Sequence, residues 1–195
     1  MKLSKVVFVL LASAVAFVHV CSGQITQRPG DSGPAVKAEL SDPQALAVDR
    51  TGTLYIAENK VFIRRVDLRT GIITTLQTKR RLEEITSLSV DRKGNLLATE
   101  YESDRVIKID PTDGSVTTIA GGGRFGFSGD GGPAKDAGLS RPESVTTDTA
   151  DNIYFADLDH NRIRRVDAKT GLSLQLPGAV GKILTATVGS RSKPD

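Results

Sequence analysis

The sequence predicts an all-β protein, and three observations support this fold class. Segments recur in the same order along the chain, short runs rich in β-branched residues alternate with turn sequences such as "DRTG" and "DRKG", and helical periodicity is missing after the first 23 residues. A repeat of about 40–50 residues is typical of propeller blades. The predicted architecture is therefore an incomplete β-propeller of about three four-stranded antiparallel blades, which follows an N-terminal signal peptide.

The repeat is clearest between residues 30–58 and 129–157. The first segment, "GDSGPAVKAELSDPQALAVDRTGTLYIAE", aligns without a gap with the second, "GDGGPAKDAGLSRPESVTTDTADNIYFAD". A middle unit repeats part of this pattern, because "LSVDRKGNLLATE" at 88–100 matches "LAVDRTGTLYIAE" at 46–58. An aspartate marks the same turn in every unit, at positions 42 and 57 residues apart: Asp49, Asp91 and Asp148. The chain therefore has three units, of which the middle one lacks the "GDGGPA" segment.

Each unit is expected to form four short strands joined by tight turns. The expected strands of the first unit are 44–48, 53–58, 61–66 and 72–76. Those of the second unit are 84–90, 95–100, 105–110 and 115–120. Those of the third unit are 143–147, 152–156, 162–167 and 171–175. The blades then span about 30–77, 82–121 and 129–175 within a propeller segment at 24–195, whose residues 176–195 form a C-terminal tail.

The segment "GDSGP" at 30–34 is similar to the sequence around the nucleophile of chymotrypsin-like serine proteases, which makes Ser32 a candidate nucleophile. However, Gly131 takes the place of Ser32 in the third unit, and glycine has no nucleophilic group. The protease mechanism also needs a histidine oriented by an acid, whereas the only histidine after residue 23 is His160, in a hydrophilic turn. Ser32 is therefore expected to be a loop residue in a connector.

The recurring segments resemble the NHL-repeat family, whose pattern "GDGGPA…L..P..VAVD..GNLYIAD…RIRRVD..TG.ITTVAG" matches best at 129–171 and next at 30–76. The resemblance covers nearly all of residues 24–175. It implies blades of a six-bladed β-propeller, a fold found in secreted or extracytoplasmic binding modules, RNA-binding domains and a metal-dependent amidating lyase. Propellers of the WD-repeat type fit less well, because the chain contains no tryptophan.

Three units are too few to close a six-bladed ring, which needs about 250 residues at roughly 40–45 residues per blade. The chain is therefore expected to form an open arc with an uncovered blade face at each end. Two alternatives follow. Two arcs pair about a two-fold axis as a homodimer that completes a six-bladed ring, or the chain is a truncated gene remnant without independent activity.

The first 23 residues have the features of a secretory signal peptide. A basic start and an apolar run up to Val20 precede small residues, so cleavage is expected after Gly23 and the protein is expected to be secreted or periplasmic, with no membrane span. A lipid anchor at Cys21 is disfavoured, because lipoprotein processing prefers a small residue before the cysteine. The leader carries two of the three net positive charges, so the mature chain has a net charge of +1 and no nucleic-acid partner is expected.

The third strand of each unit carries basic side chains, whose stems are expected to pack between blades. These residues are Arg64, Arg65, Arg105, Lys108, Arg162, Arg164 and Arg165. We expect their charged groups to reach carboxylates such as those of Asp67, Asp110 and Asp167. The alternative is a ring of positive charge that binds an anionic polymer.

Ligand binding is expected at the loops along one rim of the arc, because binding residues concentrate on loops held by a rigid scaffold. The candidates come from the glycine-rich connector and from "DLDHN" at 157–161. They are Arg124, Phe125, Phe127, Asp130, Asp157, Asp159, His160 and Asn161. The alternating oxygen ligands of "DLDHN" suggest calcium, but Arg162 and Ala168 stand where an EF-hand loop needs glycine and glutamate, so a polar hairpin loop is favoured.

The expected function is a non-enzymatic module that binds a protein or a carbohydrate, with no catalytic residue, no cofactor and no metal site. The alternative is a metal-dependent propeller hydrolase or lyase. Such an enzyme would need several histidines around a central ion, and the mature chain has one.

Overall fold

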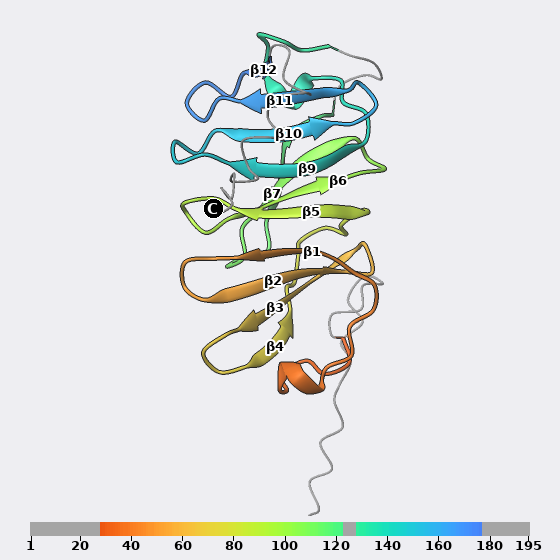
Figure 1. The fold of residues 1–195 in the computed structure, drawn as a ribbon, viewed down its shortest axis with the longest axis vertical. Coiled ribbons are helices and arrows are strands. Elements are labelled where there is room, and N and C mark those ends of the chain that lie inside the picture. Colours follow the sequence, from red (N-terminus) through yellow and green to blue (C-terminus); the bar gives the residue numbers. More distant parts are fainter. Residues whose placement is uncertain (1–27, 123–127, 177–195) are drawn as a thin grey trace, which may run out of the picture.

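The computed structural model describes residues 28–122 and 128–176, which form three antiparallel four-stranded sheets (Figure 1). The first sheet contains β1 (Pro43–Val48), β2 (Thr53–Glu58), β3 (Phe62–Asp67) and β4 (Ile72–Thr75). The second contains β5 (Ile85–Val90), β6 (Leu96–Glu100), β7 (Arg105–Ile109) and β8 (Val116–Ala120). The third contains β9 (Pro142–Thr147), β10 (Ile153–Asp157), β11 (Arg162–Val166) and β12 (Ser173–Gln175). The predicted all-β fold class is confirmed, and the ends of every expected strand lie within two residues of the observed ends.

The three sheets follow one another as neighbouring propeller blades. In every sheet the strands pair in chain order, so the first strand is the inner edge and the fourth is the outer edge. β1 packs against β5, and β5 packs against β9, as Figure 1 shows. The predicted signal peptide and most of the predicted C-terminal tail lie outside the described residues. In the part of the chain that the structure describes, no helix is long and apolar enough to cross a lipid bilayer.

Apolar side chains fill the space between neighbouring blades. The core between the first and second blades contains Tyr55, Ala57, Ile63, Leu76, Leu82, Ile85, Leu88, Leu96, Ala98, Ile107 and Ile109. The core between the second and third blades contains Leu97, Val106, Ala120, Ala134, Ala137, Leu139, Val145, Phe155 and Val166. Successive side chains of a strand point to opposite faces, so Leu96 and Leu97 of β6 belong to different cores. Each blade is thus stabilised by its neighbours.

Within the described residues no blade precedes the first one, and its inner strand shows the consequence. Leu46 of β1 corresponds to Leu88 of β5 and Val145 of β9 on the face that meets the preceding blade. Leu88 is 7% exposed and Val145 is 6% exposed, whereas Leu46 is 64% exposed. The expected open arc with an uncovered end face is therefore present in the described residues.

The segments "GDSGPA" and "GDGGPA" pair with the outer edges of the first and third blades. Ser32 N–H donates to the carbonyl of Ile73 on β4 at 2.8 Å, and Gly131 N–H donates to the carbonyl of Ser173 on β12 at 2.8 Å. The short 3₁₀ turns η1 (Ala35–Lys37) and η2 (Ala134–Asp136) follow, where no helical turn was expected. Ser32 has a φ of 65°, a conformation that glycine adopts without strain, which explains the glycine at the equivalent position. Ser32 is a connector residue, as predicted.

Candidate binding rim

A buried acidic residue ends the second strand of every blade. Glu58, Glu100 and Asp157 are all fully buried. Each carboxylate accepts a hydrogen bond from a backbone N–H in the segment that leads to the inner strand. The donors are Ser41, Glu83 and Ser140, at 2.9, 3.0 and 2.8 Å. A one-residue register irregularity accompanies each of these sites, so the acid fixes the chain where the blade begins.

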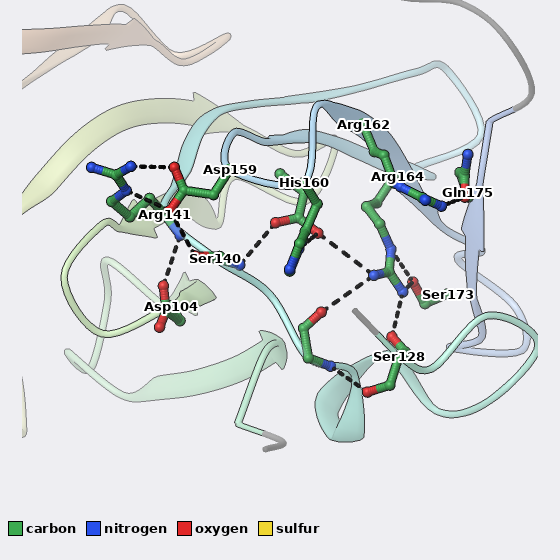
Figure 2. Close-up of polar contacts among 12 residues, drawn as sticks. Asp104, Ser128, Ser140, Arg141, Asp159, His160, Arg162, Arg164, Ser173 and Gln175 are labelled. Atoms are coloured by element: carbon green, nitrogen blue, oxygen red, sulfur yellow. Dashed lines mark hydrogen bonds and ion pairs between the residues drawn. The ribbon is translucent and has the colours of Figure 1, made fainter. Parts of the chain in front are cut away.

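In the third blade this acid belongs to a buried network centred on Arg164 of β11. The Arg164 guanidinium donates to Ser173 Oγ at 2.9 Å and to the carbonyl of Ser128 at 3.1 Å (Figure 2). It also lies 3.2 Å from Asp130 and 3.6 Å from Asp157, as ion pairs. Arg164 has no exposed surface, so this network holds the "GDGGPA" segment against the blade and does not face a ligand.

The first blade repeats this arrangement, and the middle blade does not. Arg64 of β3 is fully buried and pairs with Glu58 at 2.9 Å and with Asp31 at 3.1 Å. Asp31 is the second residue of "GDSGPA", as Asp130 is of "GDGGPA". The middle unit lacks such a segment, and Ile107 stands where the other two blades have the arginine. The aspartate of the motif is therefore one half of a buried ion pair that fastens the segment to its own blade.

The third-strand arginines reach carboxylates, as expected, but mostly other ones than the three aspartates named from the sequence. Arg165 pairs with Asp167 at 2.8 Å, as expected. Asp67 and Asp110 instead accept N–H groups of their own turns, two residues further along the chain. A carboxylate at the start of a tight turn closes that turn locally, because the N–H groups two and three residues later point at it.

An exposed polar cluster joins the second and third blades at the same end of the strands. Arg141, directly before β9, donates from Nε to Asp159 at 2.6 Å and forms a second hydrogen bond to the other carboxylate oxygen (Figure 2). Its backbone N–H donates to Asp104 of the middle blade at 2.7 Å. Its guanidinium lies 5.7 Å from the centre of the Tyr101 ring. The side chains of Arg141 and Asp159 are 50% and 33% exposed, so this cluster is accessible.

Electrostatics agree with the pairing in the exposed cluster. The hydrogen bonds from Arg141, and then from Ser140, lower the pKa of Asp159 below its ordinary value. The same partnership raises the pKa of Arg141. Both side chains are therefore charged over the whole physiological pH range.

The predicted rim residues divide into three groups. Asp159 lies in the exposed cluster, and Asn161 is exposed with a φ of 52° in the same loop. Asp130 pairs with Arg164 and is 37% exposed, and His160 lies 2.9 Å from Asp157. Asp157 was expected on an exposed loop, but it is fully buried because it closes the entry of the chain into the blade. Three candidates lie outside the described residues: Arg124, Phe125 and Phe127.

Sequence reasoning missed Arg141, Tyr101 and Asp104. These residues are separated by up to 40 positions and belong to different repeat units, so only the packing of one blade on the next brings them together. The alignment of the repeats did contain a signal for the buried network. It shows an arginine at 64 and 164 in the two units with the "GDSGPA" or "GDGGPA" segment, and isoleucine at 107 in the unit without it.

The structure also bears on the calcium alternative for "DLDHN". The carboxylate of Asp157 binds the N–H of Ser140 and lies beside Arg164, and that of Asp159 binds Arg141. These carboxylates are thus already held by nitrogen donors. Within residues 28–122 and 128–176, no group of three or more His, Cys, Asp or Glu side chains is arranged to hold a metal ion.

Comparison with known proteins agrees with this architecture. Teneurin-1 of Mus musculus is 29% identical over 168 residues, an alignment that covers 70% of this chain and 6% of teneurin-1. A streptogramin B lyase structure superposes with a TM-score of 0.53 at 20% identity, covering 72% of this chain and 43% of that chain. A chain of the nidogen–laminin complex superposes with a TM-score of 0.53 at 19% identity, covering 68% of this chain and 47% of that chain. Both structural likenesses show the fold alone, and the chain spans less than half of each of these proteins.

The family model of the teneurin NHL domain matches residues 11–119, which is more than half of the 195-residue chain. The NHL-type repeats seen in the sequence are the blades seen in the structure. The chain therefore belongs to the NHL-repeat family, in the branch described by the teneurin NHL domain.

Proposed function

We propose that the chain is a non-enzymatic, extracytoplasmic β-propeller module that binds a protein or a carbohydrate through the rim formed by its second and third blades. The observation that carries this proposal is the exposed cluster of Arg141, Asp159 and Tyr101. Arginine and tyrosine are enriched at protein interfaces. Here their side chains are already ordered by contacts between two blades, so binding costs little further conformational entropy.

The relatives support a binding role on this scaffold. A chain with the same fold occurs in the complex of nidogen with laminin, which is an assembly of two proteins. Loops on a rigid β-scaffold vary without changing the frame, and the rim of this chain is made of such loops. Export is part of the proposal. The mass of the N-terminus of the secreted product tests it, and cleavage after Gly23 is the expected result.

A binding screen with matched variants tests the rim. The purified chain is applied to an array of extracellular-matrix proteins and glycans, together with Asp159→Lys and a control, Arg69→Glu. Asp159→Lys reverses the charge beside Arg141, and Arg69 is an exposed residue in the β3–β4 turn at the other end of the strands. Any ligand retained by the unchanged chain should bind at least about tenfold more weakly to Asp159→Lys and equally to Arg69→Glu. Equal binding by Asp159→Lys contradicts the rim site.

The non-enzymatic part of the proposal has a separate test. A propeller hydrolase or lyase of the metal-dependent type would carry a bound ion, so the metal content of the purified protein is measured by mass spectrometry. We expect no stoichiometric ion. One ion per chain would favour the enzymatic alternative.

We further propose that the open ends of the arc take a second copy of the chain, so that two arcs complete a six-bladed ring. The repeats supply the complementarity. Tyr154, Ala156 and Ile163 on the free face of the third blade match three residues of the first blade that are already docked on the second. Those docked residues are Tyr55, Ala57 and Ile63.

The opposite end of the arc fits the same contact. Leu46 and Leu54 on the free face of the first blade match Leu88 and Leu96, which receive the first blade within the chain. A head-to-tail contact between copies therefore reuses the pairing of the first two blades, and two copies close the ring.

Light scattering after size exclusion should give twice the chain mass, and Leu46→Asp should give the monomer mass. A monomer for the unchanged chain contradicts the pairing.

A further inference from the structure

Each blade has two positions with left-handed backbone at the end of the strands where the candidate binding rim lies. One position is in the turn between the second and third strands, and it is occupied by Lys60, Asp104 and Asn161. The other directly precedes the inner strand, and it is occupied by Asp42, Glu84 and Arg141. All six residues have a φ between 39° and 63°, so the three blades present equivalent backbone groups there.

These two positions meet at both contacts between neighbouring blades. At the first contact, the N–H of Ile85 donates to the carbonyl of Lys60 at 2.6 Å, and the Lys60 ammonium pairs with Glu84. At the second contact, the N–H of Arg141 donates to the carboxylate of Asp104 at 2.7 Å. The turn of one blade thus holds the residues at which the inner strand of the next blade begins.

A second polar contact joins the inner strands of the second and third blades. Ser87 of β5 accepts the N–H of Val145 of β9 at 3.1 Å through its hydroxyl oxygen. β9 carries the same hydroxyl, because Ser144 has the position in β9 that Ser87 has in β5. The first blade has Ala45 at this position, which offers no acceptor. The hydroxyl is therefore a feature of the second and third blades.

The third blade presents both kinds of acceptor on its free face. Asn161 stands where Asp104 accepts an N–H, and its side-chain carbonyl is an acceptor of the same kind. Asn161 and Ser144 are both exposed. Within residues 28–122 and 128–176, neither side chain forms a hydrogen bond. The acceptors by which the second blade holds the third are thus repeated where the described arc ends.

The first blade carries the matching donors on its own free face. The N–H of Asp42 is the equivalent of the Arg141 N–H, because both residues directly precede an inner strand with nearly the same φ. Leu46 of β1 has the position of Val145 of β9 in the strand register. Its N–H is therefore equivalent to the one that Ser87 accepts.

We propose that Asn161 and Ser144 of one copy accept the N–H groups of Asp42 and Leu46 of a second copy. This inference rests on the proposed pairing of two arcs and adds the polar groups that orient it. Apolar contact is non-directional, so the hydrogen bonds set the register in which the third blade of one copy meets the first blade of the other. Each bond occurs twice in the ring, once at each contact between the copies.

Sedimentation velocity over a concentration series measures the dissociation constant of the pair. Asn161→Ala and Ser144→Ala each remove two hydrogen bonds from the ring, so each should weaken pairing at least about fivefold. The matched control is Asn59→Ala. It removes the same exposed amide at a φ of 49°, from the equivalent turn of the first blade, which packs on the second blade of its own copy. Asn59→Ala should leave the dissociation constant unchanged.

Amide hydrogen exchange reports the two donors directly. The N–H groups of Asp42 and Leu46 should be protected above the dissociation constant and exchange freely below it. In Asn161→Ala at a concentration that still gives the pair, protection should be lost at Asp42 and kept at Leu46.

The outcomes separate this inference from the pairing on which it rests. A chain that is monomeric at every concentration refutes both. A pair of unchanged affinity in Asn161→Ala and Ser144→Ala leaves the pairing intact and overturns the hydrogen bonds, and so does an Asp42 amide that stays protected in Asn161→Ala. Both substituted side chains are exposed, so the far-ultraviolet circular dichroism of the variants should match that of the unchanged chain.

Discussion

The buried arginine of the third blade is predicted to be one of the most sensitive single positions in the chain. Arg164→Met keeps a long apolar side chain and removes the guanidinium. Five acceptors then lose their donor or partner: Asp130, Asp157, Ser173 and the carbonyls of Ser128 and Gly138. Asp157 is the critical one, because its carboxylate is fully buried and would keep the Ser140 N–H and His160 as partners but lose its guanidinium.

The expected cost follows from this burial. Removing one partner of a buried ion pair costs about 3–5 kcal/mol, because the remaining charge is left without compensation. In a chain of this length each kcal/mol lowers the melting temperature by about 2–4 °C. Arg164→Met should therefore lower the melting temperature by about 6–20 °C.

The neighbouring residue provides a matched control. Arg165 lies on the same strand but on the opposite face, and it pairs with Asp167 with both side chains about one quarter exposed. A pair of this kind contributes about 0–1 kcal/mol, so Arg165→Met should lower the melting temperature by no more than about 4 °C. Calorimetry and urea unfolding on the three proteins measure the difference in the free energy of unfolding.

Equal destabilisation by the two substitutions would refute this reasoning, because burial and not charge alone is the stated cause. Should Arg164→Met fail to fold, Asp130→Asn offers a milder step. It removes one charge of the network from a side chain that is 37% exposed, and it should cost about 0.5–1.5 kcal/mol. No measurable change with Asp130→Asn would show that the "GDGGPA" segment is not held by this pair.

Three further predictions concern acid stability, glycine and the core. The side-chain amide of Asn152 lowers the pKa of Asp148 from 3.8 to about 2. The stabilisation by this carboxylate is therefore fully present above pH 3.8 and is lost as the pH falls towards 2. Asp148→Asn should make the melting temperature depend less on pH between these two values. Gly129→Ala should cost more than Gly131→Ala in urea unfolding, because both have positive φ but only at Gly129 would the new Cβ lie 2.7 Å from Ala137. Leu88→Ala should cost about 2–5 kcal/mol, measured in the same way, since Leu88 is 7% exposed between two blades.

Most of the fold could be predicted from the sequence because its signals are local and repeated. The turn at Asp49 closes on itself, with its carboxylate accepting the N–H groups of Thr51 and Thr53. The same chemistry recurs at Asp91 and Asp148, so three independent copies of one turn set the register of the strands. A strand prediction that rests on three matching turns is more reliable than one that rests on a single turn.

The candidate binding rim could be predicted only in part, because its contacts cross the boundaries between units. Asp159 was visible as a polar loop residue, but its partner Arg141 lies 18 positions earlier and was not identified. Asp157 was assigned to the same exposed loop, although it is the counterpart of Glu58 and Glu100. Burial depends on the neighbouring segments that cover a residue, and hydrophilicity along the chain does not report it.

The middle blade explains what the three blades share and what they do not. Its acid, Glu100, accepts the same kind of backbone N–H as the acids of the other blades, but its cations come from other positions: Arg80 before β5 lies 2.7 Å away, and Arg105 at the start of β7 lies 3.2 Å away. The acid is therefore the constant part, because it satisfies a donor that every blade buries where the chain enters. The position of the cation is variable. An arginine at the position of Arg64 and Arg164 also reaches the aspartate of a "GDSGPA" or "GDGGPA" segment and holds that segment on the outer edge, whereas Ile107 at the same position cannot. In agreement, Thr117 and Thr118 on the outer strand of the middle blade are exposed. The residue at this position of the third strand, arginine or isoleucine, thus correlates with whether a "GDSGPA" or "GDGGPA" segment covers the outer edge of the blade.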